Sequence, residues 1–230
     1  MPKRTRPAAV SAVAARVSGP QRAREGVAMS AAEFVPDGAD LATLGKAADE
    51  CRGCDLYRNA TQTVFGEGPQ DAHVVMVGEQ PGDREDILGH PFVGPAGRLL
   101  DKALTEVGID RSTVYMTNAV KHFKFTERGK RRIHQQPARG EITACAPWLQ
   151  AELAVIRPQL VVCLGAVAAQ AVLGPSFRVS RQRGQLISLP DFHAIATVHP
   201  SAVLRAPDRD EAYRDFVADL REAHTAMALH

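Results

Sequence analysis

The apolar positions of this chain follow two patterns, short continuous runs and stripes at helical spacing. Continuous runs are typical of strands buried on both faces of a sheet, and they lie at residues 73–77, 113–117, 160–164 and 194–198. The helical stripes lie at residues 41–50, 96–107, 141–156, 167–173 and 208–227. Because strands and helices alternate, the pattern predicts an α/β fold with three layers, αβα, and a central, mostly parallel four-stranded sheet.

Two segments modify this picture. Pro147 lies inside the stripe at 141–156 and predicts a kink or a restart of that helix. Residues 177–188 have room for additional extended segments.

Glycine-rich or polar motifs follow each of the four predicted strands. They are residues 78–82, Asn118, Gly165 and residues 199–201. In parallel sheets, ligands bind outside the carboxyl ends of the strands. We therefore expect these motifs to line one shared pocket, although glycine, proline and polar residues also collect at strand ends for structural reasons.

Residues 1–33 carry Arg and Lys among alanines, with few acidic residues and no apolar periodicity. This composition predicts a disordered basic N-terminal tail, followed by a single domain at residues 34–230. The start also resembles a transit peptide, and Met29 is an alternative first residue. No secretory signal pattern is seen, and no apolar run approaches the roughly 20 residues that span a bilayer. We expect a cytoplasmic protein that binds no membrane.

The formal net charge of +2 is too small to indicate a nucleic-acid-binding protein overall, so such a site needs a local concentration of cations. Residues 121–139 supply one, because cations there are opposed only by Glu127 and alternate with Phe123 and Phe125. The cations are Lys121, Lys124, Arg128, Lys130, Arg131, Arg132 and Arg139.

Residues 130–137 combine Lys130, Arg131, Arg132 and His134, with Gly129 before them and Pro137 at their end. Glycine and proline interrupt regular structure, so we interpret this stretch as an ordered loop. Nearby positive charge disfavours imidazolium, which should keep the pKa of His134 low and leave the ring neutral as a nucleophile or base. The alternative is a solvated basic loop that contacts phosphate.

The motif at residues 78–82 is neither a P-loop nor a dinucleotide-binding fingerprint. It presents Glu79, Gln80 and Asp83 instead. Carboxylates at a pocket stabilise a cationic transition state, as the cleavage of an N-glycosidic bond requires. They also cap helices, so this signal alone is weak.

Two further residues fit the recognition of a nucleobase. Phe92 lies in a loop rich in proline and glycine, where an aromatic ring either stacks on a flipped base or fills the core. Asn118 has the donors and the acceptor to read a pyrimidine edge, or it caps a strand end.

Cys51 and Cys54 form a Cys-x-x-Cys pair, which in a chain without a signal sequence indicates metal or redox chemistry. With Cys145 they make three thiolate candidates, and His122 is the preferred fourth ligand. Cys163 lies within an apolar run and fits a core position better. The set suits an iron-sulfur cluster, or zinc equally well.

Taken together, these residues resemble the iron-sulfur uracil-DNA glycosylases, and within them the UdgX type, which crosslinks itself to DNA. The resemblance covers about residues 45–225. It rests on the Cys-x-x-Cys pair, on Gly78-Glu79-Gln80-Pro81-Gly82-Asp83, Pro91-Phe92-Val93-Gly94-Pro95, Asn118-Ala119-Val120-Lys121-His122 and His199-Pro200-Ser201. Lys130-Arg131-Arg132-Ile133-His134 is the most specific motif, because it matches the inserted loop of the UdgX type.

The resemblance implies excision of uracil from DNA, preferably single-stranded, and a structural [4Fe-4S] cluster. It also implies roles by position: Phe92 stacks on uracil, Asn118 reads its edge, and Gln80 and Asp83 line the pocket. Glu79 assists catalysis, His199 stabilises the departing uracil, and His134 captures C1′ of the sugar. Lys130, Arg131 and Arg132 hold the DNA, and we expect a monomer.

Two alternatives remain open at this stage. In one, water attacks the sugar, the enzyme turns over many times, and His134 only contacts DNA. In the other, the protein is a non-catalytic single-stranded DNA-binding module, in which Phe123 and Phe125 stack on bases.

Overall fold

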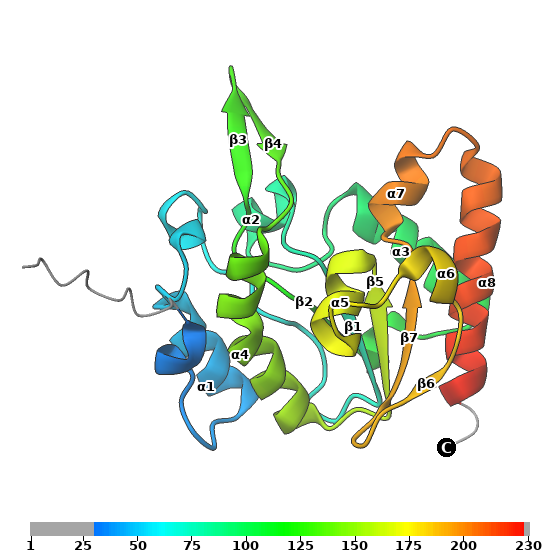
Figure 1. The fold of residues 1–230 in the computed structure, drawn as a ribbon, viewed down its shortest axis with the longest axis horizontal. Helices are drawn as coiled ribbons and strands as arrows, with labels where there is room; N and C mark the ends of the chain where they lie inside the picture. Colours follow the sequence, from blue (N-terminus) through cyan, green and yellow to red (C-terminus); the bar gives the residue numbers. More distant parts are fainter. Residues whose placement is uncertain (1–29, 228–230) are drawn as a thin grey trace, which may run out of the picture.

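Five strands form the central sheet, in the order β2-β1-β5-β7-β6 (Figure 1). The computed structural model describes residues 30–227. The four predicted strands are present and parallel: β1 (Val74–Gly78), β2 (Val114–Asn118), β5 (Leu160–Leu164) and β7 (His193–Thr197). A fifth strand, β6 (Ile187–Ser188), pairs antiparallel with β7 at the edge. The mostly parallel sheet is confirmed, and its strand number is corrected from four to five, because β6 is too short to give an apolar run.

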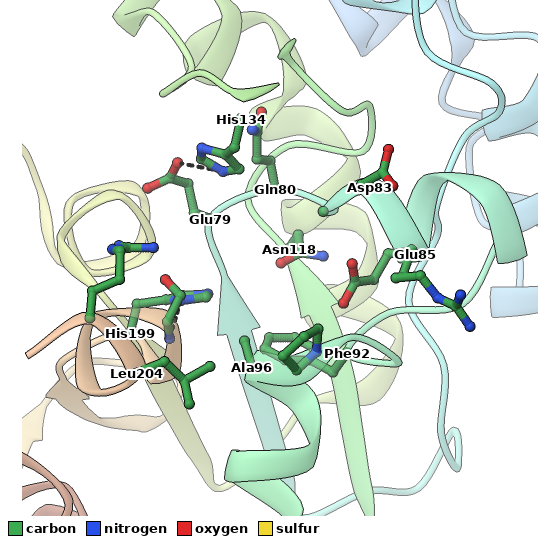
Figure 2. A pocket seen from close by; sticks show the side chains of 15 residues that line it. Glu79, Gln80, Asp83, Glu85, Phe92, Ala96, Asn118, His134, His199 and Leu204 are labelled. Carbon is green, nitrogen blue, oxygen red and sulfur yellow. Dashed lines mark hydrogen bonds and ion pairs between the residues drawn. The ribbon is translucent and has the colours of Figure 1, made fainter. Parts of the chain in front are cut away.

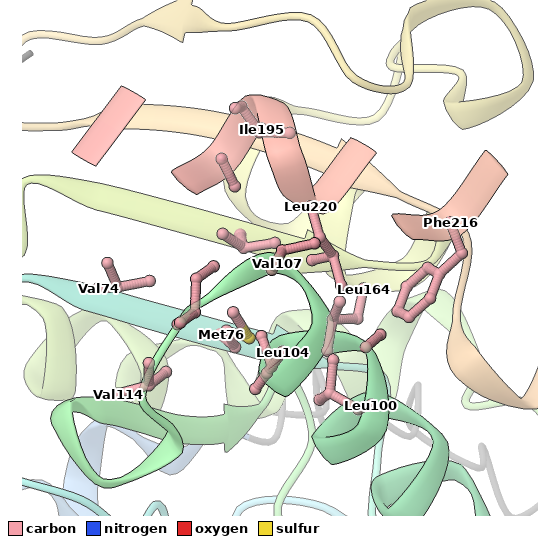
Figure 3. Close-up of a cluster of buried hydrophobic side chains, with 14 of the residues drawn as sticks. Val74, Met76, Leu100, Leu104, Val107, Val114, Leu164, Ile195, Phe216 and Leu220 are labelled. Carbon is pink, nitrogen blue, oxygen red and sulfur yellow. The ribbon is translucent and has the colours of Figure 1, made fainter. Parts of the chain in front are cut away.

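Successive side chains of each strand point to opposite faces of the sheet, and helices cover both faces. Val74 and Met76 lie on the face covered by α3 (Pro95–Val107) and α8 (Arg209–Met227) (Figure 3). Val75 and Val77 lie on the face covered by α4 (Arg139–Ile156) and α5 (Ala166–Leu173). This alternation gives the three predicted layers.

A third buried cluster, the α1/α4 core, joins the N-terminal part of the domain to α4. It includes Leu44 of α1 (Leu41–Asp49), Leu56 of η2 (Asp55–Arg58) and Trp148 of α4. Ala31 of η1 (Ala31–Phe34) is buried there too, so the segment 31–34 belongs to the folded domain. The predicted tail at 1–33 is therefore too long at its C-terminal end, and residues 1–29 lie outside the described residues.

The remaining helices are short, namely α2 (Asp83–Leu88), η3 (Arg111–Thr113), α6 (Val179–Gln182) and α7 (Pro200–Arg205). α4 runs through Pro147 without a restart. Cys163 is fully buried in the sheet, as expected of a core residue. Among the described residues, no helix combines the length and the apolar character that crossing a membrane demands.

The basic stretch forms a β-hairpin, which corrects the predicted loop. β3 (Phe125–Arg128) and β4 (Arg131–His134) pair antiparallel, with Phe125 opposite His134. Gly129 makes the turn with φ of +61°, a conformation that glycine adopts readily. The hairpin projects from the body of the molecule above α4 (Figure 1). Its strands are polar and largely exposed, so no apolar alternation marked them in the sequence.

Candidate active site

A pocket of about 550 Å³ opens where β1, β2 and β7 end (Figure 2). It brings together the residues predicted to share one site: Glu79, Gln80, Asp83, Phe92, Asn118, His134 and His199. Glu85 and three residues of α7, Ser201, Leu204 and Arg205, also line it. Ser201 belongs to a motif that was expected to line the pocket. The sequence reasoning missed Glu85, Leu204 and Arg205, although Arg205 follows the His199-Pro200-Ser201 motif by about one helical turn.

The floor of the pocket depends on Gly78 at the end of β1. A Cβ atom at this position would lie 2.3 Å from Asn118 Oδ1 and 2.7 Å from Phe92 Cζ. Phe92 is held with φ of +59°, an uncommon conformation for a residue other than glycine. Because Gly78 has no side chain, the Phe92 ring and the Asn118 amide can both lie close to its backbone. A flat ligand therefore has room between the ring and the amide.

His199 precedes α7, and its ring stacks near Phe92 with the centroids 6.4 Å apart. The backbone N–H of Ser201 donates to His199 Nδ1 over 3.1 Å. Nδ1 is therefore an acceptor, and the proton of the neutral ring lies on Nε2. Burial, with help from His134 and Arg205, lowers the pKa of His199 to about 4. At neutral pH His199 is an uncharged hydrogen-bond donor.

His134 is the last residue of β4, and its side chain lies at the rim of the pocket, opposite Glu79 (Figure 2). Its Nε2 lies 3.5 Å from Glu79 Oε1, a buried oxygen that accepts no hydrogen bond from any residue between 30 and 227. Burial raises the pKa of Glu79, with Arg205 opposing that effect. The pair places a proton acceptor beside an imidazole at the mouth of the pocket.

The pKa of His134 is lowered, as predicted, but the cause differs. Burial contributes most, and the positive charge that lowers the pKa further is that of Arg205. The prediction had assigned this effect to Lys130, Arg131 and Arg132. The hairpin explains the difference, because β4 directs His134 towards α7.

Gln80 holds the base of the hairpin. Its Nε2 donates to the carbonyls of Lys124 at 3.2 Å and Gln135 at 3.0 Å, one on each side of the hairpin. Its Oε1 accepts from the backbone N–H of Lys124 at 3.1 Å. The amide of Gln80 lines the pocket as predicted, but its hydrogen bonds go to the segment that carries His134.

Arg132 is a second attachment of the hairpin, and it does not line the pocket. Its guanidinium donates to Asp83 at 2.6 Å and to Asp86 at 2.5 Å. The same group covers the rings of Phe123 and Phe125, which stack on each other at 5.1 Å. Arg132 was expected to contact the substrate, but an ion pair with two α2 carboxylates already engages it.

The basic surface is smaller than the sequence suggested. Lys121 is fully buried and pairs with Glu152, while Lys124 pairs with Glu141. The cations of this region that stay exposed are Arg128, Lys130, Arg131 and Arg139. Three of them stand at the tip of the hairpin.

Comparisons with known proteins agree with this site. The model of the uracil DNA glycosylase superfamily matches residues 65–221, more than half of the chain. The chain belongs to this superfamily. It is 37% identical over 171 residues to a type-4 uracil-DNA glycosylase of Archaeoglobus fulgidus, which covers 71% of this chain and 82% of the relative. A type-4 uracil-DNA glycosylase of Thermotoga maritima is 38% identical over 176 residues, 76% of this chain and 88% of the relative.

A type-5 uracil-DNA glycosylase of Pyrobaculum aerophilum is more distant, at 30% identity over 154 residues, 58% of this chain and 63% of that relative. The predicted resemblance is thus confirmed for the superfamily, and with it the expectation of a uracil-DNA glycosylase enzyme.

The predicted metal ligands of this superfamily member lie in the α1/α4 core. Cys51, Cys54 and Cys145 are all buried there, and burial raises the pKa of Cys145 to about 12. Trp148 Nε1–H donates to Cys51 Sγ at 3.2 Å, and the backbone N–H of Lys121 donates to Cys145 Sγ at 3.3 Å. Such donors support thiolates that bind iron.

His122, the fourth predicted ligand, is buried with its Nε2 3.0 Å from Thr63 Oγ1, so Nδ1 is the ring nitrogen left to bind a metal. Within residues 30–227, no three His, Cys, Asp or Glu side chains converge closely enough to form a ready metal site. The chemistry of the donors fits an iron-sulfur cluster.

Proposed function

We propose that this protein excises uracil from DNA, preferably from single strands, and then becomes joined through His134 to C1′ of the abasic site. In this proposal it works as a monomer in the cytoplasm. Extruding a base costs least from a single strand, where no partner base must be given up.

Recognition of the base follows from the floor of the pocket. Uracil stacks on Phe92, and the Asn118 amide pairs with its edge by donating to O4 and accepting from N3–H. The two side chains meet over Gly78, so the pocket admits a flat ring.

Cleavage breaks the bond between C1′ and N1, and the bonding electrons leave with uracil. His199 donates its Nε2 proton in a hydrogen bond to the uracil anion, while the Glu79 carboxylate stabilises the positive charge at C1′. A neutral histidine suits this task, because it donates without carrying a charge into the pocket.

The observation that carries the crosslinking proposal is the contact between His134 and Glu79 at the rim of the pocket. His134 Nδ1 forms a bond to C1′, and the resulting imidazolium loses the proton that it carries on Nε2. Glu79 Oε1, 3.5 Å from Nε2, is placed to accept it. A nucleophile held at the mouth of the pocket, beside C1′ of the bound nucleotide, competes with water at a very high effective concentration.

The two alternatives are less well supported. A turnover enzyme needs water to reach C1′ before His134, yet Gln80 and Arg132 both hold the hairpin over the pocket. A non-catalytic module needs free aromatic faces, but Phe123 is buried and Phe125 is covered by Arg132.

We further propose that Cys51, Cys54, His122 and Cys145 hold a [4Fe-4S] cluster. When bound, it supplies a structural link between the Cys-x-x-Cys segment and α4. Brown protein with an absorption band near 400 nm and stoichiometric iron supports this assignment. Colourless protein with one zinc ion overturns it in favour of the zinc alternative.

The functional test uses a single-stranded oligonucleotide that contains one uracil, with a thymine oligonucleotide as the matched control. After mixing and heating in SDS, a denaturing gel should show a slower complex only with uracil. With substrate in excess, the released uracil should equal the protein in amount. More uracil than protein supports the turnover alternative, and binding without release supports the non-catalytic one.

A further inference from the structure

We propose that the buried ion pair between Lys121 and Glu152 positions Asn118 for base recognition. This inference rests on the proposed function and concerns two residues that lie behind the pocket.

The ammonium group of Lys121 is fully buried and has three acceptors. Its Nζ lies 2.6 Å from Glu152 Oε2, 2.6 Å from Thr117 Oγ1 and 2.9 Å from the carbonyl oxygen of Asn118. An ammonium group has three protons, so every donor is used. One of the three bonds ends on the residue whose side chain faces the base.

Glu152 is equally enclosed. Its carboxylate accepts from Tyr115 Oη at 3.0 Å, from Thr117 Oγ1 at 2.9 Å and from the backbone N–H of Gly66 at 3.2 Å. A Cβ atom at Gly66 would approach Glu152 Oε1 to 2.5 Å, so the surrounding chain is fitted to this carboxylate. The fully bonded carboxylate fixes the ammonium group in one place.

Burying the charged groups of Lys121 and Glu152 costs desolvation free energy. An apolar pair of similar volume often stabilises a protein as well or better, because it needs no desolvation. The charges must therefore do something that an apolar pair cannot. Lys121 is the side chain that donates to the Asn118 carbonyl, which makes positioning of this turn the specific effect of the pair.

Backbone bonds also hold the turn after β2. Ala119 N–H donates to Gly78 O at 2.9 Å and Val120 N–H donates to Glu79 O at 3.0 Å. The Asn118 amide tolerates little displacement, because uracil and cytosine present opposite donor and acceptor patterns at the same edge. A small shift of this backbone weakens the hydrogen bonds that stabilise the departing anion.

The experiment uses the double variant Lys121→Met/Glu152→Leu, which removes both charges and leaves neither unpaired. Uracil release is measured with protein in excess over a single-stranded uracil oligonucleotide. Because the substrate limits the amplitude under these conditions, the folded fraction is measured separately by circular dichroism, and the rate constant at saturating protein reports the geometry of the site. We expect a rate constant lowered about ten- to a hundredfold at an unchanged amplitude. A wild-type rate constant, at whatever amplitude, overturns the proposal.

A cycle with Asn118→Ala tests whether the pair acts through Asn118. If it does, adding Lys121→Met/Glu152→Leu to Asn118→Ala causes no further loss of rate. If the losses multiply, the pair acts elsewhere and the proposal is wrong. If the double variant does not fold, the single variant Lys121→Arg tests the proposal in its place. Its planar guanidinium keeps the charge but does not reproduce the three bonds, so the folded variant must be slower than wild type, and an equal rate overturns the proposal.

Tyr115→Phe is the matched control, since it removes one hydrogen bond to Glu152 without touching Asn118. We expect its rate constant to stay within about twofold of wild type; a loss as large as that of the double variant contradicts the proposal. Wild-type protein that releases no uracil refutes the proposed function instead. If wild-type protein releases uracil and the variants release it with the same rate constant, only this inference is refuted, and the proposed function stands.

Discussion

Arg205 acts on three titratable side chains of the pocket. Its charge adds to the burial that lowers the pKa of His134 and His199, and it opposes the rise that burial causes in the pKa of Glu79. A neutral imidazole is what a nucleophile requires, so the lowered pKa keeps His134 competent below pH 6.5, the ordinary value for histidine. In the proposed crosslinking reaction, burial of His134 and the charge of Arg205 together set the acid limit.

Arg205→Met should raise the pKa of His134 in the free protein, because the positive charge that opposes protonation is lost. The crosslinking rate falls as the pH drops through the pKa of His134, so this acid limb should move to higher pH. An NMR titration of the His134 ring measures the shift without substrate. Arg131→Met is the control. A shift of the His134 pKa in Arg131→Met, with none in Arg205→Met, contradicts this account.

Gly78→Ala should slow uracil release about a hundredfold, because the added methyl group enters the space of Asn118 and Phe92. Overpacking should also cost about 1–3 kcal/mol of unfolding free energy. Gly140→Ala is the matched control, since a Cβ atom there meets nothing within 4 Å. Single-turnover rates and chemical denaturation compare the two. If Gly78→Ala and Gly140→Ala release uracil at equal rates, the pocket floor at Gly78 is not tightly fitted to the base.

At the scale of elements, the β3–β4 hairpin is the part of the fold that carries His134, the proposed nucleophile. It projects from the sheet, and side-chain bonds from Gln80 and Arg132 fix its orientation. Because these attachments differ from the residues that read the base, capture and excision should be separable by mutation.

Gln80→Leu should lower the yield of crosslinked protein about tenfold, because the freed hairpin no longer holds His134 near C1′. Uracil release should change far less. Both are measured on one sample, by denaturing gel and by free uracil. Gln136→Leu, at an exposed neighbour of the hairpin base, is the control. Equal losses of release and crosslinking contradict the separation.

Buried and exposed elements differed in how well the sequence predicted them. β1 and β5 are buried on both faces, so their apolar runs marked them almost to the residue. β4 is held by polar side chains from distant segments, and no local pattern records such bonds. The ion pairs that bury Lys121 and occupy Arg132 were invisible for the same reason, so the basic patch was overestimated.

At the scale of the whole molecule, the strand order places the pocket. β1 pairs with β2 on one side and with β5 on the other, so the chain changes direction across the sheet beside β1. Ligands of parallel α/β sheets bind at such points. The sequence alone predicted the shared pocket, because motif positions at strand ends are local information. The participation of Arg205 depends on the packing of α7 against α3 and α8, which the sequence does not record.

Removal of the metal should loosen the N-terminal part of the domain and spare the sheet. The α1/α4 core is small and contains all three proposed cysteine ligands. Cys145→Ser should lower the iron content and make residues 30–60 sensitive to limited proteolysis. Cys163→Ser, which alters a buried cysteine outside that core, is the matched control. Iron loss without new cleavage contradicts a structural role of the metal.

The central claim is that His134 captures the sugar after uracil has left. The most direct measurement compares wild-type protein and His134→Ala on one uracil oligonucleotide, reading free uracil and the SDS-resistant complex together. The account predicts that His134→Ala still releases uracil and forms no complex, while wild type forms one complex per uracil released. A His134→Ala protein that still crosslinks would contradict it.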